Sequence, residues 1–427
     1  MNKKLTHSLL VASLLGTTLL AQEQAEPIAQ KRDRIPSVRK AVDSVAKLPQ
    51  KEVDIIDTFQ RMFSDGKVSG QIRTVYASYN NKEINAADTY ATAIGGILKY
   101  ELAQLNGFNA GVAFYTSQDI NFATGDGEKH NDELSSQEGS YNQLSEAYIN
   151  YNYKDFNFRG GRQILDTPLA DSDDIRMIQN TFDAAILTYN YNDINLLAGY
   201  IDRWQGFDAG LDDGWVKAGA TYTTLAGISY DEAFELNAWF YNFDEVANAY
   251  YFDIGGEYNF NKNISLHLGA QYLYESTLNQ SNYAADIYGA LCEFEVYDIG
   301  FNLAFNQANK QTAKQSYSGN GGGKLFTSMD TLIVDDIAND RDVTAVVAGV
   351  SYTYKKFDFL YAYGDFDGGK NSAGVKAHLS EQDIAFEYAY NDAFTLGGIY
   401  VIHQDEHNDQ KTEDDWDRMQ FLLNYNF

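Results

Sequence analysis

The chain has 427 residues and a net charge of −28, and its single cysteine, Cys292, has no partner for an internal disulfide. Such acidity argues against nucleic acid as a partner, because phosphates would be repelled, and the lone cysteine excludes a disulfide-stapled scaffold. The 32 tyrosines, 25 phenylalanines and 34 glycines, against only 4 prolines, favour strands and tight turns. The length is compatible with two or three soluble domains or with one large barrel.

The first 66 residues differ in texture from the rest. Residues 1–21 join a basic start to an apolar run that ends at Ala21, which predicts a secretory signal peptide cleaved after that residue. Residues 22–66 carry three of the four prolines and apolar residues at helical spacing. They predict a periplasmic N-terminal extension that is partly helical or disordered. No run of eighteen apolar residues follows, so no helix is expected to span a membrane.

From residue 67 to 427, short turns flanked by aromatic residues recur, mostly about 30 to 40 residues apart. Asn, Asp, Lys and Gly between strand-forming residues are typical of β-hairpin turns. Each interval holds a strand, a longer polar loop and a returning strand, so eight turns and two ends predict about 18 strands. The turns are Leu105–Phe108, Tyr153–Phe156, Tyr191–Ile194, Tyr230–Phe234, Phe260–Ile264, Val296–Ile299, Tyr354–Phe357 and Tyr390–Phe394.

The final strand shows the alternation most clearly. One face is apolar and ends on an aromatic carboxyl terminus, whereas the other is mostly polar. Short turns on one side, long loops on the other and a polar second face predict an all-β, transmembrane, antiparallel up-and-down barrel. To close it, the last strand must pair with the first, near Val68–Tyr79. The apolar face comprises Met419, Phe421, Leu423, Tyr425 and Phe427. Cys292 shares the parity of Tyr288, Ala290 and Phe294 in its own strand, so it is expected to face lipid or a neighbouring subunit.

The most unusual interval lies between Phe156 and Tyr191. Arg159 lies on the polar face of its strand, and a bulge at Gly160–Gly161 would re-aim Arg162. Arginines opposite carboxylates across a narrow pore create a transverse field that orients charged solutes. The alternative is that these arginines only neutralise the acids of their own loop. The constriction candidates are Arg159, Arg162, Arg176, Asp171, Asp173 and Asp174. Local parity adds Arg73, Arg203, Lys217, Glu257 and Arg418 as lumen-facing candidates, although one bulge reverses parity.

The acidic and glycine-rich loops are expected to be solvated at the cell exterior. They include residues 208–214, 319–323 and 403–417, the second being the expected tip of the longest loop. Weak Ca²⁺ binding at acidic loops such as Asp171–Asp174 stays open, but the spacing of a dedicated site is missing, so no cofactor or metal site is expected. No Ser-His-acid grouping stands out from ordinary loop composition, which predicts that the chain is not an enzyme.

Two patches carry a resemblance to a known family. Gly161–Gln163 leading into Thr167–Pro168, then Asp174–Arg176 and Thr181–Phe182, form one patch, and Asp65–Arg73 forms the other. Together with the signal peptide and the expected strand number, they resemble the OprD-type outer-membrane porin family, especially its ε-proteobacterial branch. The resemblance covers residues 65–427 in architecture and these two patches in motif.

The resemblance implies a monomeric or trimeric 18-stranded channel with short periplasmic turns and longer extracellular loops. It also implies an inward-folded third loop that forms the constriction, with Arg159, Arg162 and Arg176 lining the pore. The aromatic terminus, Phe427, is similar to the signal that the barrel-assembly machinery of outer-membrane proteins looks for.

We therefore expect an outer-membrane porin of a Gram-negative cell that lets small hydrophilic solutes and ions diffuse through a water-filled channel. Its net acidity predicts cation selectivity. Its expected partners are outer-membrane lipid and lipopolysaccharide, the barrel-assembly machinery, the solutes and, if it is a homotrimer, two further copies. The alternative is a surface adhesin or structural outer-membrane barrel whose acidic loops bind external ligands or surfaces.

Overall fold

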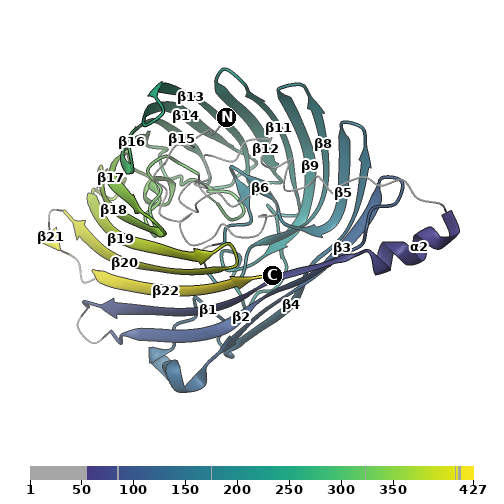
Figure 1. The fold of residues 1–427 in the computed structure, drawn as a ribbon. Coiled ribbons are helices and arrows are strands. Elements are labelled where there is room, and N and C mark those ends of the chain that lie inside the picture. The colour runs from purple at the N-terminus through teal and green to yellow at the C-terminus, as the bar shows by residue number, and fades with distance from the viewer. Residues whose placement is uncertain (1–54, 84–85, 175, 323, 409, 412–414) are drawn as a thin grey trace.

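The computed structural model describes residues 55–427, except 84–85, 175, 323, 409 and 412–414, so the predicted signal peptide and most of the predicted extension lie outside the described residues. One antiparallel sheet closes on itself as a barrel (Figure 1). The sheet has 20 strands, and leaving out the two-residue segments β10 (Val216–Lys217) and β21 (Gln410–Lys411) gives 18 that form the wall. The predicted all-β barrel of about 18 strands is confirmed.

The wall strands follow one another around the barrel in chain order. They are β1 (Lys67–Asn81), β2 (Thr89–Glu101), β3 (Phe108–Asp119), β4 (Ser140–Tyr153), β5 (Phe156–Gln163), β8 (Thr181–Tyr191), β9 (Ile194–Gln205), β11 (Thr223–Asp231), β12 (Glu235–Phe243), β13 (Ala247–Asn261), β14 (Ile264–Thr277), β15 (Ala285–Val296), β16 (Ile299–Ala308), β17 (Val343–Tyr354), β18 (Phe357–Gly368), β19 (Ala377–Asn391), β20 (Phe394–His407) and β22 (Trp416–Asn426).

The barrel closes where the sequence predicts. β22 pairs with β1 from Gln71 opposite Asn426 to Asn81 opposite Trp416. Past the end of the strand, the backbone of Phe427 exchanges two hydrogen bonds of 3.0 Å with Gly70. Phe421, Leu423 and the other apolar members of this strand point outward, and its alternate residues point inward and are buried. The predicted faces of the last strand are therefore confirmed.

All eight predicted turns join neighbouring strands at one end of the barrel. Five contain a non-glycine residue with positive φ, as tight hairpin turns require; these are Asn106, Lys154, Asn192, Tyr297 and Lys355. The long loops lie at the other end, with one exception: only residues 244–246 join β12 to β13, so not every interval holds a long loop. Residues 403–417 are also less of a loop than expected, because β20 continues to His407 and β22 begins at Trp416.

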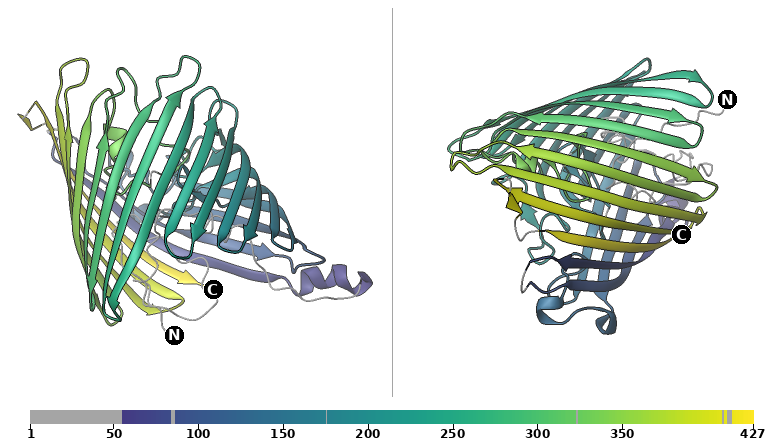
Figure 2. Two further views of the ribbon diagram at one scale, coloured as in Figure 1. Left: turned by 90° about the horizontal axis from the view of Figure 1, so that it is seen from above. Right: turned by 90° about the vertical axis from the view of Figure 1, so that its left-hand side faces the viewer.

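The outer surface carries an apolar band. Large apolar side chains such as Leu98, Leu268 and Leu303 are about half exposed on the outward parity of their strands. Aromatic pairs flank the turns, including Phe108 with Tyr151 at 4.3 Å between ring centroids, as in an interfacial girdle. A closed barrel with such a coat satisfies its backbone internally and presents its apolar face to lipid. Figure 2 shows the strands tilted. The wall that contains β13 to β20 is taller than the opposite wall, which contains β5 to β9 (Figure 2).

None of the helices among the described residues is long and apolar enough to cross a membrane. The helix α2 (Ile55–Ser64) precedes β1 and projects from the turn end of the barrel (Figure 1). The backbone of Ala103 donates to the carbonyl of Met62, and Tyr100 donates to that of Phe63, so the end of α2 contacts the β2–β3 turn.

Three loops fold into the barrel wholly or in part. Loop 2 (residues 120–139) begins with the exposed short turns η3 (Asn121–Ala123) and η4 (Gly127–Lys129), which lie outside the wall, and only its second half, residues 131–136, is largely buried inside (Figure 1). Loop 3 (residues 164–180) contains the hairpin β6 (Asp166–Thr167) and β7 (Ala170–Asp171), and β6 lies inside the barrel in Figure 1. Loop 7 (residues 309–342) is the longest and contains α3 (Val334–Ile337).

Loop 7 corrects one prediction. Its glycine-rich stretch is not a solvated tip, because Asn320 is fully buried and its backbone donates to the carbonyl of Leu169 in loop 3 at 2.9 Å. Beyond that stretch, apolar side chains of the loop pack on apolar residues of the inner wall and form a core inside the barrel. The packed residues include Leu325, Phe326, Met329 and Leu332 from the loop and Ala345, Val347, Leu360, Ala362 and Phe366 from β17 and β18.

Candidate functional site

The inner surface of the barrel is charged and unevenly so. The basic side chains on its inward parity belong to strands near the closure, namely Lys67 and Arg73 on β1, Lys99 on β2, Arg159 on β5 and Arg418 on β22. In the described parts of β12 to β20, the inward parity carries carboxylates but no lysine or arginine. Those carboxylates include Asp253, Glu257, Glu275, Glu293, Asp358, Glu381, Asp383 and Glu387. The lumen is therefore polarised across its width.

Arg73 ties loop 3 to the wall. Its two terminal nitrogens lie 2.7 and 2.9 Å from the two carboxylate oxygens of Asp174, and Nη1 also donates to the backbone carbonyl of Arg176. Nε donates to Asn424 on β22 at 2.8 Å, so every arm of the guanidinium has a partner. Arg73 has no exposed surface. A paired two-bond contact of this kind fixes orientation as well as distance.

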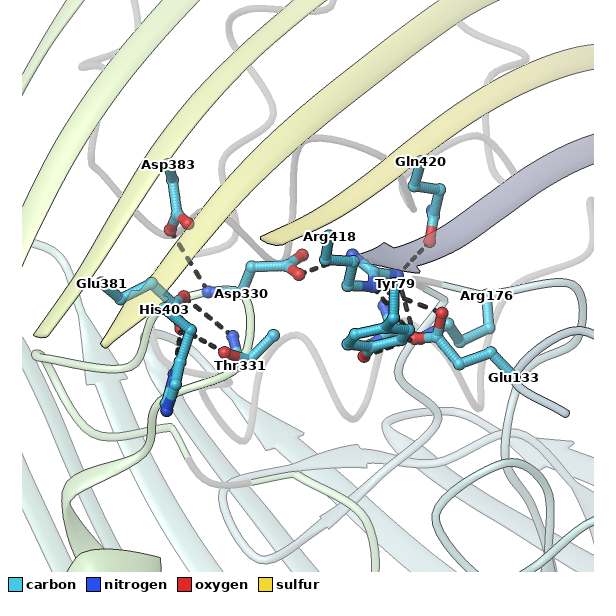
Figure 3. A network of polar contacts seen from close by, with 10 residues as sticks. All are labelled: Tyr79, Glu133, Arg176, Asp330, Thr331, Glu381, Asp383, His403, Arg418 and Gln420. Atoms are coloured by element: carbon cyan, nitrogen blue, oxygen red, sulfur yellow. Dashed lines mark hydrogen bonds and ion pairs between the residues drawn. The ribbon is translucent and has the colours of Figure 1, made fainter. Parts of the chain in front are cut away.

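Arg418 joins two loops to β22. Its Nη1 lies 2.6 Å from Asp330 Oδ2 in loop 7, and its Nη2 lies 3.0 Å from Glu133 Oε1 in loop 2. The Glu133 carboxylate is shared, because Arg176 of loop 3 approaches the same oxygen at 2.8 Å. Tyr79 also donates to it at 3.4 Å. Figure 3 shows loops 2, 3 and 7 meeting at this pair of arginines.

A second contact holds loop 7 against β19. The backbone nitrogen of Thr331 donates to Glu381 Oε1 at 3.0 Å, and its hydroxyl donates to the other oxygen of that carboxylate (Figure 3). The backbone of Asp330 donates to Asp383 at 3.4 Å. Behind them on β20, His403 stacks on Trp416 with the ring centroids 4.5 Å apart and lies 3.9 Å from Glu381. Loop 7 is thus bound to both β19 and β22.

Loops 3 and 7 also bind each other. Lys324 Nζ lies 2.6 Å from Asp171 Oδ2. Burial raises the pKa of Asp171, and Lys324 opposes that rise while Asp166 and Asp173 add to it. Burial also raises the pKa of Glu133, but Arg176 and Arg418 overcome it and leave the pKa below its usual value. Glu133 is therefore held as a carboxylate.

A third cluster lies nearer the turn end. Lys99 Nζ lies 2.9 Å from Glu146 on β4, whose other oxygen accepts from Tyr115 at 3.0 Å. Arg159 stacks on the ring of Tyr148, with its guanidinium carbon 4.2 Å from the ring centroid, and donates to Asn150. Arg159 thus faces the lumen, as its parity predicts.

The structure places most of the predicted site residues inside the barrel. Arg73, Arg159, Arg176, Arg418 and the three aspartates of loop 3 are on the inner side, and all but Asp173 are buried. Glu257 also lies on the inward parity, but close to the turn end and exposed. The charged residues of loop 3 pair with the wall and with other loops: Asp174 with β1, Arg176 with loop 2 and Asp171 with loop 7. The alternative of purely local neutralisation is thus incomplete.

Three predicted residues are on the wrong side. Arg162 lies within β5, which has no bulge, so it lies opposite Ala147 and points outward. Arg203 points outward because a bulge at Asp202 shifts the register between β8 and β9. Lys217 lies on the two-residue strand β10, which is separated from β11, and is directly opposite Arg203 of β9 in the sheet. It therefore points outward as well. These three residues do not line the lumen. In each case the side of the sheet depends on whether a bulge is present nearby, and the sequence did not predict this correctly.

Several residues of the site were not predicted. Glu381 and Asp383 lie on the inward parity of β19, which strict alternation would have revealed. Glu133 and Asp330 lie in loops, where no periodic signal marks them. The inward docking of loop 7 does have a sequence signal: residues 343–350 are apolar at nearly every position, which indicates cover on both faces of β17. Among the described residues, no group of three or more His, Cys, Asp or Glu is arranged to hold a metal ion.

These features define a membrane-spanning β-barrel whose charged interior is narrowed by loops, the architecture of outer-membrane channels. The fold is shared with OpdK of Pseudomonas aeruginosa, crystallised with vanillate (TM-score 0.73, 15% identity, 86% of this chain and 99% of that chain). It is also shared with OccAB2 of Acinetobacter baumannii (0.71, 15%, 86% and 99%) and with a BenF-like porin of Pseudomonas fluorescens (0.73, 9%, 86% and 99%).

The predicted resemblance to OprD-type porins is thus confirmed at the level of the fold. No protein-family model matches the sequence, and a search of curated proteins finds no match.

Proposed function

We propose that the chain is an outer-membrane porin through which small hydrophilic solutes and ions diffuse passively. The observation that carries the proposal is a charged inner surface enclosed by a closed barrel with an apolar coat. The interior of an outer-membrane barrel is polar, and in porins that polar interior is a water-filled channel. In this placement the eight short turns face the periplasm and the long loops face the exterior.

In the proposed channel, loops 2, 3 and 7 form the constriction. Arg73 and Arg418 serve as anchors for these loops rather than as contacts for solutes, because neither has exposed surface. Solutes then pass charged groups that keep some exposure, such as Lys99 and Glu101 near the turn end. The proposed role of the arginines is thus to set the width and shape of the passage.

The charge distribution supports weak cation selectivity. Carboxylates line the inward parity from β13 to β19, and the lumen-facing cations near the closure are partly neutralised by Glu101 and Glu146. A solute with charged ends would be oriented across this field. Proposed partners beyond the solutes are the lipid around the barrel and the barrel-assembly machinery acting through Phe427; a homotrimer is compatible with the fold.

Planar-bilayer recordings of the purified protein test the proposal. We expect ohmic conductance. In a salt gradient, we expect a reversal potential whose sign shows that cations permeate more readily than anions. Glu257→Gln removes an exposed lumen-facing charge and should reduce cation preference, whereas Asp367→Asn, on the outward parity of β18, is the matched control and should leave it unchanged. Absence of conductance above background would refute the proposal.

A further inference from the structure

A row of charged side chains crosses the outer surface of the barrel. Arg162 on β5 lies opposite Asp183 on β8, Asp183 lies opposite Arg203 on β9, and Arg203 lies opposite Lys217 on β10. Directly opposed residues share one face of a sheet, so all four side chains point the same way. That direction is outward, because the neighbour of Arg162 on its other side is Ala147, on the outward parity of β4.

The row lies at the upper edge of the apolar band. Apart from Gly160 and Thr224, the outward residues below it, toward the turns, are apolar or aromatic down to the end of the strands. From Asp183 to the turn residue Tyr191 the strand rises about 26 Å, or near 20 Å along the barrel axis at a typical tilt. The row thus stands where lipid headgroups meet the hydrocarbon. The residues below it include Ile149, Phe158, Leu187, Leu196, Tyr200 and Ile228.

An aromatic ring holds the two arginines in place. The guanidinium carbons of Arg162 and Arg203 lie 4.8 and 5.5 Å from the ring of Trp215. Arg203 pairs with Asp183 at 2.9 Å, and Lys217 pairs with Asp202 at 2.6 Å. Arg162 donates to the backbone carbonyl of Leu144 at 3.0 Å. The row holds three cations and one carboxylate, and the adjoining Asp202 adds a second carboxylate, so these five residues together carry one net positive charge.

Positive charge at this place contrasts with the rest of the chain, whose net charge is −28. Near the loop end of the taller wall, the outward carboxylates outnumber the lysines. Asp365 and Asp367 on β18 and Glu406 on β20 lie beside one lysine, Lys376, and one histidine, His378. Guanidinium groups bind phosphate in a paired geometry. Arg203 donates to Asp183 through Nε and Nη2, and Arg162 donates to a backbone carbonyl through Nη1, so a phosphate reaches the remaining nitrogens or replaces Asp183.

We propose that Arg162, Arg203 and Lys217, ordered by Trp215, bind a phosphate group of lipopolysaccharide in the outer leaflet. The proposal rests on the outer-membrane placement proposed above, but not on the channel. The lipid chains lie on the apolar band below the row, and the phosphate meets the two guanidinium groups and the ammonium group. Asp183 and Asp202 compete with the phosphate for these cations and hold them apart when no lipid is bound.

Native mass spectrometry of protein refolded without lipopolysaccharide tests the proposal, with lipid A carrying both phosphates and lipid A with the phosphates removed. We expect tighter binding of the phosphorylated form. R162Q/R203Q/K217Q should weaken that binding at least about tenfold, because each lost charge-assisted contact costs on the order of a factor of ten. D183N/D202N should strengthen it. K376Q, which removes a cation paired with Asp367 at 3.1 Å on the taller wall, is the matched control.

Equal binding of both lipid forms, or unchanged binding by the triple variant, would overturn the proposal. A triple variant that changes oligomeric state but not lipid binding would assign the row to a contact between copies instead. Resistance of the unheated barrel to denaturation on gels shows that the variants fold. Because the triple variant leaves the lumen intact, its conductance tests the channel separately: loss of lipid binding with normal conductance separates the two proposals.

Discussion

Replacing Arg418 by glutamine should release loop 7 without unfolding the barrel. Arg418 is fully buried and lies 2.6 Å from Asp330 of the loop and 3.0 Å from Glu133. In the variant, Glu133 keeps Arg176 at 2.8 Å, so the cost falls mainly on Asp330, which is left as a buried carboxylate. Breaking one side of a buried ion pair costs about 3–5 kcal/mol.

That cost translates into a measurable opening. At 1.36 kcal/mol per factor of ten, the loop should open about 10²- to 5 × 10³-fold more often. The loop is not lost, because Thr331 still binds Glu381 and Lys324 still binds Asp171. Hydrogen exchange of residues 324–338 is the direct assay, and single-channel recordings should show added transitions to a higher conductance.

A double-variant cycle measures the interaction between Arg418 and Asp330 directly. D330N/R418Q removes both partners and should exchange more slowly than R418Q alone, because no charge is left buried without its partner. K376Q, a change of one cation on the outer surface, should behave like the unaltered protein. Exchange rates in residues 324–338 that are the same in R418Q and in the unaltered protein would refute the anchoring role of Arg418.

Three further predictions follow from neighbouring features. Deleting Phe427 removes two backbone hydrogen bonds to Gly70 and the terminal aromatic group, so assembly in cells should be impaired more than the conductance of the molecules that do assemble; normal assembly yields would contradict this. R159E should shift the reversal potential toward cations, whereas R162E, three residues away but outward, should not, and equal shifts would contradict the assigned faces. Hydrogen bonds from Ala313 and Ser372 lower the pKa of Asp340 in loop 7. Because the pKa of Asp340 is lower in the folded protein than the value near 3.9 of the unfolded chain, its carboxylate stabilises the fold above pH ~3.9, and this stabilisation is lost as pH falls below that value. Exchange of residues 309–316 should therefore rise only at acid pH. D340N should show that rise already at neutral pH.

The wall of the barrel was predictable because its signals are local and repeated. A turn such as Tyr191–Ile194 carries its own chemistry, and the alternation of the last strand survives because no bulge interrupts it. Closure then follows from the need to satisfy every backbone group in lipid. The strand number came from counting these units, since each is one hairpin.

Side-chain placement at the rim was harder to predict because it depends on single irregularities. The bulge at Asp202 turned Arg203 outward, whereas the absence of a bulge at Gly161 left Arg162 outward as well. The partners of Arg418 lie far away in sequence, with Asp330 and Glu133 in loops that carry no periodic pattern. Their meeting depends on how three loops pack together. Alternation along a single strand holds no information about that.

The central claim is passive diffusion through the lumen, and solute uptake by proteoliposomes tests it most directly. Vesicles containing the purified protein should admit a small sugar and small charged solutes down their gradients without ATP or an ion gradient, and R418Q should admit larger solutes than the unaltered protein. Vesicles that stay as impermeable as protein-free ones, with the barrel shown to be folded, would contradict the claim.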